Sequence, residues 1–189
     1  NNFFENRLIP DGQLYFYDVA DTNGTQNMTN TYNAEFVDFD NDGWLDLFLI
    51  GADQFPTKIY KNNQDGTYTD VDTIIGRALI GNVGGDLNGG KAIDYDNDGD
   101  LDLFFHDHLR STSSGGTQVS DVARLLYRND GGWNFVDVTE EEGLLEANRG
   151  SYDSAFADID LDGDWDLVAT TDSRTRERVY LSNASTNGN

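Results

Sequence analysis

The sequence predicts an all-β chain built from repeated four-stranded antiparallel sheets. The first observation behind this prediction is a nine-residue aspartate-rich segment that occurs three times, at 38–46, 94–102 and 158–166. The second is that short apolar and aromatic runs of strand length flank each copy. The third is the spacing of the copies, which start 56 and 64 residues apart. Four short strands repeated at such a period are typical of a β-propeller, whose sheets, or blades, pack face to face with their neighbours.

The aspartate-rich segments are predicted to join strands and not helices. Around the first copy, Ala34–Val37 leads in and Leu45–Leu49 leads out, and both runs are rich in apolar residues. An EF-hand would need a glutamate at loop position 12 and a helix on each side. Position 12 is instead Leu49, Phe105 and Ala169 in the three copies. Each segment is therefore predicted to be a loop between two β-strands.

A second landmark follows each loop and predicts the third strand of the blade. Tyr60 and Tyr180 each lie 14 residues after the last aspartate of their loop, whereas Tyr127 lies 25 residues after it. The middle repeat therefore contains an insertion of 11 residues. The serine- and glycine-rich stretch 110–118 is the predicted loop that holds it.

A third landmark is an aromatic residue, any residue, aspartate and valine, followed five residues later by glycine. It occurs at 16–24, 68–76 and 135–143. Because the first match precedes every aspartate-rich loop, residues 1–24 are predicted to be the back half of an earlier blade. Its two strands are expected at 3–4 and 14–19, with a turn at 10–12. The chain is thus expected to contain sheets of two, four, four and three strands and little helix.

The predicted organisation is a single propeller segment over residues 1–189. It consists of a half blade at 1–24, full blades at 31–76 and 88–143, and a partial blade at 151–183. Only about three blades are present, and a closed ring needs at least about four. The chain is therefore expected to be a segment of a longer protein, with assembly of further copies as the alternative.

The loops carry the predicted chemistry, which is calcium binding. Carboxylates at positions 1, 3, 5 and 9 would repel one another strongly unless a cation lay among them. Hard oxygen ligands without Cys, Met or His favour Ca²⁺ or Mg²⁺, and a flexible cage of many oxygens suits Ca²⁺ better. Glycine at position 6 permits the turn, and position 7 would add its backbone carbonyl. The predicted ligands of three Ca²⁺ sites are Asp38, Asp40, Asp42, Trp44 and Asp46; Asp94, Asp96, Asp98, Asp100 and Asp102; and Asp158, Asp160, Asp162, Asp164 and Asp166.

Composition limits the classes of partner. The formal net charge is −23 and the pI is about 4.1, which argues against nucleic acid or an anionic membrane as a partner. The chain has no cysteine, so disulfide and thiol chemistry are excluded. No apolar run approaches the length needed to cross a membrane. Asn23, Asn27 and Asn183 begin glycosylation sequons, which would be used only in a eukaryotic secretory pathway.

These motifs resemble a known family. The loops look like the FG-GAP/VCBS repeats of integrin α-subunit propellers, and residues 126–139 are similar to repeats of the ASPIC/UnbV and cartilage acidic protein group. The resemblance covers nearly the whole chain. It implies an extracellular propeller with calcium in the loop between the first two strands of a blade. One departure from the pattern is Leu161, which stands where the other loops have Asn41 and Asn97.

The function predicted from the sequence is a non-enzymatic, secreted or cell-surface module for adhesion or for binding a protein or glycan. No catalytic constellation is recognisable. Two alternatives stay open: a propeller segment of a secreted carbohydrate-active enzyme, and a subunit of an extracellular filament or coat. His106 and His108 would share one face of a strand, where they would bind a metal or transfer protons. We interpret them instead as polar residues at a strand end.

Three further features of the sequence are interpreted as structural. Gly85–Lys91 has the spacing of a phosphate-binding loop, but Ala92 replaces the required Ser or Thr. We interpret this stretch as a glycine-rich connection between blades. The tryptophans are either sugar-stacking platforms or blade packing, and we favour packing; they are Trp44, Trp133 and Trp165. The basic cluster 174–178 is interpreted as a solvated turn.

Overall fold

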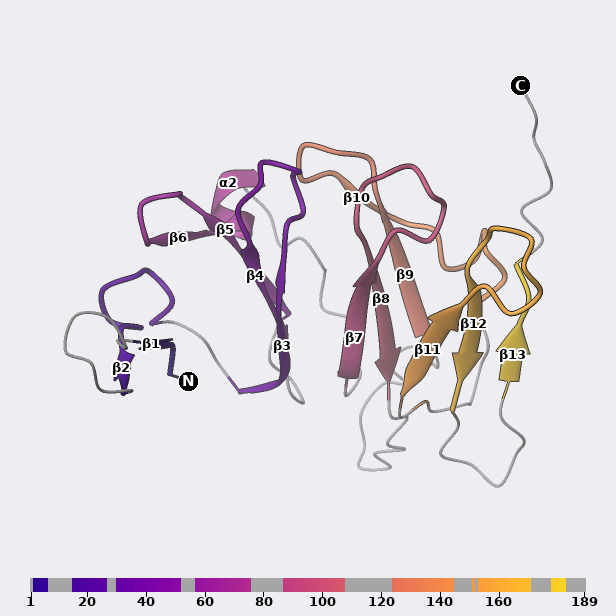
Figure 1. Ribbon diagram of the computed structural model, residues 1–189, viewed down its shortest axis with the longest axis horizontal. Helices are drawn as coiled ribbons and strands as arrows, with labels where there is room; N and C mark the ends of the chain where they lie inside the picture. The colour runs from indigo at the N-terminus through magenta and orange to yellow at the C-terminus, as the bar shows by residue number, and fades with distance from the viewer. Residues whose placement is uncertain are drawn as a thin grey trace, which may run out of the picture.

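The apolar runs of the sequence form short strands, and in the computed structural model the regular structure of the described residues is all-β apart from one turn of helix (Figure 1). The structure describes residues 2–6, 15–26, 30–51, 57–75, 87–107, 124–144, 151, 153–170 and 178–182. Within these residues the strands are β1 (Phe4–Asn6), β2 (Phe16–Asp18), β3 (Thr31–Val37), β4 (Asp46–Gly51), β5 (Lys58–Asn62), β6 (Tyr68–Asp70), β7 (Leu87–Ile93), β8 (Asp102–Asp107), β9 (Arg124–Asn129), β10 (Phe135–Asp137), β11 (Ser154–Ala157), β12 (Asp166–Ala169) and β13 (Arg178–Tyr180). The helix, α2 (Val71–Ile75), follows β6 directly.

The strands form four antiparallel sheets in chain order. These are β1–β2, β3–β4–β5–β6, β7–β8–β9–β10 and β11–β12–β13. The strand numbers of two, four, four and three agree with the sequence prediction. In every sheet, strands that follow one another in the chain are hydrogen-bonded neighbours. Each sheet is therefore a meander, and the connection between its first two strands is an aspartate-rich loop in the last three sheets.

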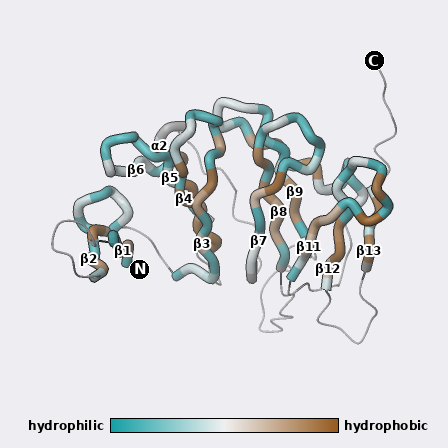
Figure 2. The backbone as a smooth tube through the Cα atoms, viewed as in Figure 1, coloured by the Kyte–Doolittle hydropathy of each residue, from teal (hydrophilic) through white to brown (hydrophobic). Residues whose placement is uncertain are grey.

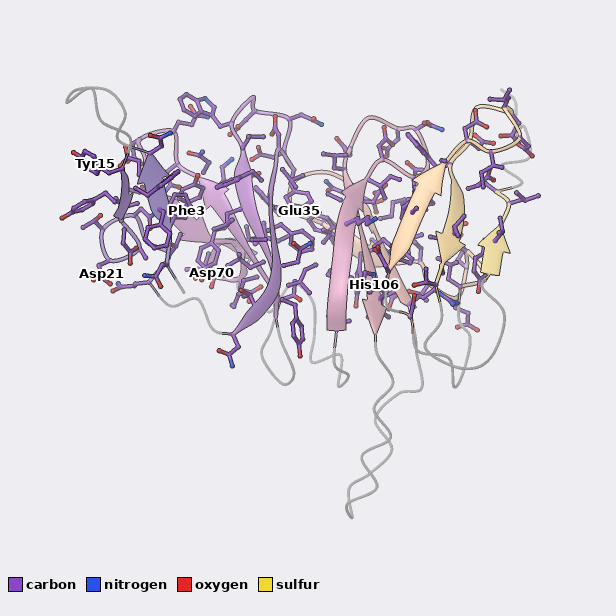
Figure 3. All side chains as sticks on the ribbon, turned by 60° about the horizontal axis from the view of Figure 1, so that its bottom comes forward. Phe3, Tyr15, Asp21, Glu35, Asp70 and His106 are labelled. Carbon is purple, nitrogen blue, oxygen red and sulfur yellow. The ribbon has the colours of Figure 1, made fainter. Side chains whose placement is uncertain are left out.

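The sheets stack because the side chains of each central strand alternate between its two neighbours. On β4, Leu47 and Leu49 face one way and pack with Phe3, which lies between the N-terminal hairpin and the second sheet (Figure 3). Phe48 and Ile50 face the other way, toward the third sheet. The rings of Phe48 and Phe105 meet edge to face with centroids 5.8 Å apart. Strand periodicity thus supplies two apolar faces from one short strand.

The third and fourth sheets meet in the same way. Phe104 of β8 is fully buried, and its ring contacts Phe156 of β11 edge to face at 5.2 Å. Leu126 and Leu167 belong to the same apolar cluster. Figure 2 shows the result along the chain, with hydrophobic residues gathered in the strands and hydrophilic residues in the connections.

Polar contacts reinforce the junction between the second and third sheets and the junction between the third and fourth. Glu35 on β3 lies beside β7 (Figure 3), where its carboxylate accepts a hydrogen bond from the backbone N–H of Ala92 at 3.4 Å. Arg124 of β9 is fully buried and donates from Nη1 to the hydroxyl of Tyr180 on β13 at 2.7 Å. The guanidinium also lies 5.2 Å from the centroid of the Tyr180 ring.

One interpretation of the sequence is wrong. Residues 87–91 are not part of a connection between blades but belong to strand β7. Their glycines are explained by close packing, since a Cβ on Gly90 would lie 2.5 Å from the carbonyl oxygen of Phe104 and 2.9 Å from the Phe105 ring. The glycine-rich pattern therefore marks a close approach of two strands and not a turn.

The boundaries of some elements differ from those expected, and one element was not expected. The first two strands are Phe4–Asn6 and Phe16–Asp18, shorter or shifted relative to 3–4 and 14–19. Helix α2 was not expected; it buries Val71 in the core between the second and third sheets. The predicted turn at 10–12, the insertion at 110–118 and most of the basic cluster at 174–178 lie outside the described residues.

The packing between sheets predicts that loss of a buried aromatic side chain lowers stability far more than loss of an exposed one. Replacing Phe104 by alanine should lower the free energy of unfolding by about 3–5 kcal/mol, because it leaves a cavity between two sheets. Replacing Phe16, which is 61% exposed, should change it by no more than about 0.5 kcal/mol. Chemical denaturation at fixed calcium concentration measures both. Similar losses for the two variants would contradict the packing scheme.

Candidate metal centres

The three loops share one backbone conformation. Position 4 is in the left-handed region in each loop, with φ of 55° at Asn41, 60° at Asn97 and 64° at Leu161. The glycine at position 6 also has positive φ, 86° at Gly43 and close to that value in the other loops. Glycine adopts this conformation without steric cost, and asparagine tolerates it better than most residues. The repeated sequence therefore produces a repeated turn.

The aspartate at position 1 organises the interior of each loop. The two carboxylate oxygens of Asp38 accept backbone hydrogen bonds from Asp42 at 3.1 Å and Gly43 at 2.9 Å. Asp158 makes the equivalent pair of bonds in the third loop, and Asp94 accepts from Gly99 at 3.1 Å in the second. The chain is thereby wrapped around the first carboxylate.

The aspartate at position 9 closes the loop and attaches it to the next strand. Asp46 is fully buried, and its two oxygens accept the backbone N–H of Phe39 at 3.1 Å and of Asn62 at 2.8 Å. Asp102 and Asp166 are equally buried and make the same two bonds in their own loops. Asp102 accepts the backbone N–H groups of Tyr95 and Asn129. Asp166 accepts those of Ile159 and Ser182. These aspartates were predicted only as metal ligands, and the local motif carries no signal for their hydrogen bonds to residues at or just beyond the end of the third strand.

The remaining aspartates bring carboxylate oxygens together. Three groups have one oxygen per residue within 4.8 Å of one another: Asp38, Asp40 and Asp42; Asp94, Asp96 and Asp102; and Asp158, Asp160 and Asp166. The donors are all hard oxygens, which is the chemistry that Ca²⁺ prefers. Asp40 Oδ1 and Asp94 Oδ1 are also buried without a hydrogen-bond donor among the described residues. These three clusters could therefore hold metal ions.

The structure divides the predicted ligands into two sets. Asp46, Asp98 and Asp162 lie outside the tight groups. Asp98 and Asp162, both at position 5, accept the backbone N–H two residues later, at 2.8 and 3.0 Å, a bond that Asp42 also makes within its tight group, at 2.9 Å. The ligand roles of the position-7 residues Trp44, Asp100 and Asp164 stay predictions.

The first loop differs from the others because a lysine enters it. Lys61 of β5 donates to the carboxylates of Asp40 and Asp42, the latter at 2.9 Å. Its hydrogen bond, together with that from the backbone of Trp44, lowers the pKa of Asp42. The corresponding residues of the other repeats are Arg128, which pairs with Asp130, and Leu181. In the sequence, the difference between the loops is visible at the residue that follows each landmark tyrosine.

Without a cation, the surroundings of several loop aspartates disfavour the ionised form of the carboxyl group. Burial raises the pKa of Asp46 to about 6 and that of Asp102 to about 7, although backbone N–H bonds act in the opposite direction. Desolvation and the charge of Asp98 raise the pKa of Asp96. A divalent ion would reverse these effects, since it favours the ionised form.

The histidine and tryptophan candidates lie in different environments. His106 is buried at 4% exposure on β8, opposite Arg124 on β9, while His108 lies outside the described residues. Trp133 is partly buried against the core, and its ring centroid lies 6.4 Å from that of Phe39. Trp44 and Trp165 are 47% and 40% exposed. Packing therefore accounts for one of the three tryptophans.

The sequon at Asn23 is not an accessible acceptor in this fold. The residue is 4% exposed, and its side-chain oxygen accepts hydrogen bonds from the backbone and hydroxyl of Thr25 at 3.1 and 2.6 Å. Asn27 and Asn183 lie outside the described residues.

Comparison with known families agrees with this architecture. Residues 38–105 match the family model described as FG-GAP-like repeat, a range that begins at the first aspartate of loop one and ends on β8. Residues 38–105 are accordingly an FG-GAP-like repeat segment, which supports the resemblance stated from the sequence. No curated protein matches the chain. FG-GAP repeats are typical of extracellular proteins. None of the described residues forms a helix of the length and hydrophobicity that a membrane span requires.

The raised pKa values predict the pH dependence of the metal-free protein. A carboxyl whose pKa is higher in the folded state stabilises the fold less as it ionises, so the free energy of unfolding should fall as pH rises from about 4 to about 7. Melting temperatures of metal-free protein at pH 5 and pH 8 measure this fall. Asp102→Asn should reduce it, whereas substitution of the exposed Asp21 by asparagine should not. A fall of the same size in both variants would contradict the assignment to Asp102.

Proposed function

We propose that the chain forms part of an extracellular β-propeller-like module in which the three aspartate-rich loops hold structural Ca²⁺. The observation that carries the proposal is the presence of three carboxylate clusters at the same place in successive repeats. The loops that contain them lie along one edge of the row of sheets (Figure 1). The FG-GAP-like repeat over residues 38–105 supports the same conclusion.

Calcium would act on stability and not on chemistry. Within each tight cluster the three carboxylates would ligate the ion, and it would offset their mutual repulsion. If each site has a dissociation constant near 0.1 mM and free Ca²⁺ is about 1 mM, binding adds roughly 1.4 kcal/mol per site. Domains are typically stable by only about 5–15 kcal/mol. Such sites would be filled outside the cell and empty at submicromolar cytosolic calcium, which supports a secreted or cell-surface protein.

The stacking of the sheets supports a propeller. The central strands β4 and β8 bury side chains on both faces, whereas strands of the first and last sheets expose apolar side chains. Phe4 and Phe16 of the first sheet are 56% and 61% exposed, and Val179 of the last is 56% exposed. In this proposal further blades, from the same protein or from other copies, cover these faces.

Exposed apolar and aromatic side chains in the loops support a ligand-binding role. Trp44 and Leu45 in the first loop, and Ile159 and Trp165 in the third, are each at least 40% exposed. Exposed aromatic rings beside bound cations suit a protein or glycan ligand. This supports a module for adhesion or ligand binding and gives the loops a second use beyond stability.

Calcium removal tests the structural role. Adding about 1 mM Ca²⁺ to metal-free protein should raise the melting temperature, and Mg²⁺ should do so less, because it demands a stricter octahedral geometry. Asp160→Asn should lose about one third of the calcium effect. The matched control is Glu141→Gln, which removes an exposed charge outside the loops. An unchanged melting temperature in millimolar Ca²⁺ would contradict the proposal.

A further inference from the structure

The three loops are linked to one another by the residue at position 4. Asn41 in the first loop donates from Nδ2 to the side chain of Asp100 at 2.6 Å and to the carbonyl of Gly99 at 3.4 Å, both in the second loop. Asn97 in the second loop donates to the carbonyl of Gly163 in the third at 3.3 Å. The same position therefore bridges successive loops twice.

The backbone conformation explains why position 4 reaches outward. Its positive φ turns the side chain away from the cluster of its own loop, and asparagine combines tolerance of this conformation with a hydrogen-bond donor. Leu161 has the same φ in the third loop but is 86% exposed and carries no donor. The third loop therefore has no side-chain hydrogen-bond donor at position 4.

The acceptors of these bridges are parts of the neighbouring metal-binding turn. The N–H of Gly99 binds the carboxylate of Asp94, and the carbonyl of the same residue accepts from Asn41. Gly163 has the same two contacts, with Asp158 and Asn97. An ion that fixes the position-1 aspartate therefore also fixes the carbonyl to which the preceding loop is bonded.

We infer that calcium binds to the three loops cooperatively, with Asn41 and Asn97 as the positioning residues that transmit occupancy from one loop to the next. This inference rests on the proposed function. Binding at one loop orders the acceptor of the bridge, so the neighbouring loop loses less conformational freedom when it binds. The bridge from Asn41 has two contacts, one of them to a carboxylate, so it couples more strongly than the bridge from Asn97.

Glycine substitutions at position 4 test the inference. Glycine keeps positive φ accessible and removes the donor. Calcium titration of the metal-free full chain by calorimetry should give a Hill coefficient above 1. Asn41→Gly should lower that coefficient and weaken mean affinity by about 2- to 10-fold, with a smaller change for Asn97→Gly. Leu161→Gly is the matched control and should leave both values unchanged.

A second measurement separates coupling from simple stabilisation. Asp160→Asn disables the third loop and should weaken calcium binding at the remaining loops, but not when Asn97→Gly is already present. This double-mutant cycle isolates the interaction between loops. Equal Hill coefficients in all position-4 variants, with calcium still bound, would overturn the coupling while leaving the proposed function intact. Absence of calcium binding by the unmodified chain would overturn both.

Discussion

Carboxylates of like charge crowded into nine-residue turns are the constraint around which this fold is built. Backbone N–H groups hold the turns at two points. The aspartate at position 1 accepts hydrogen bonds from within the loop. The buried aspartate at position 9 connects the loop to the end of the third strand, at Asn62 and Asn129, or to Ser182 just beyond that end. Asp46, Asp102 and Asp166 thus set where the second strand begins and how it aligns with the third. Loop and sheet form one unit.

Stacking of the sheets depends on the alternation of short strands that begin at those aspartates. Strands β4 and β8 both start at the position-9 aspartate. Side chains at the same distance from that aspartate therefore point to the same face of the sheet in each repeat. Phe48 and Phe105 then meet between the second and third sheets, and Phe104 meets Phe156 between the third and fourth. The same stacking brings the loops into a row, which makes the asparagine bridges between them possible.

The three loops are similar in backbone but differ in chemistry. A lysine ammonium already neutralises part of the first cluster, while the equivalent positions of the other repeats are an arginine paired elsewhere and a leucine. Position 9 belongs to the tight oxygen group in the second and third loops, and position 5 takes its place in the first. A repeated motif therefore presents candidate metal sites of unequal composition, and the first is the one in which an ion would compete with a lysine ammonium.

The sequence by itself determined the loops, the strands that flank them and the number of strands in each sheet, because these depend on residue patterns within about ten positions of one another. It also marked the carboxylates that gather in each cluster. Partnerships across longer separations were decided by the tertiary structure. Lys61 reaches Asp40, and Asn41 reaches Asp100, only after sheets have formed and stacked. The glycines of β7 were misread for the same reason, since Gly90 lies against the Phe104 carbonyl and Gly89 against the His106 ring, both on the neighbouring strand β8. Local pattern fixes the turn and the strand, whereas contacts between repeats depend on how the sheets pack.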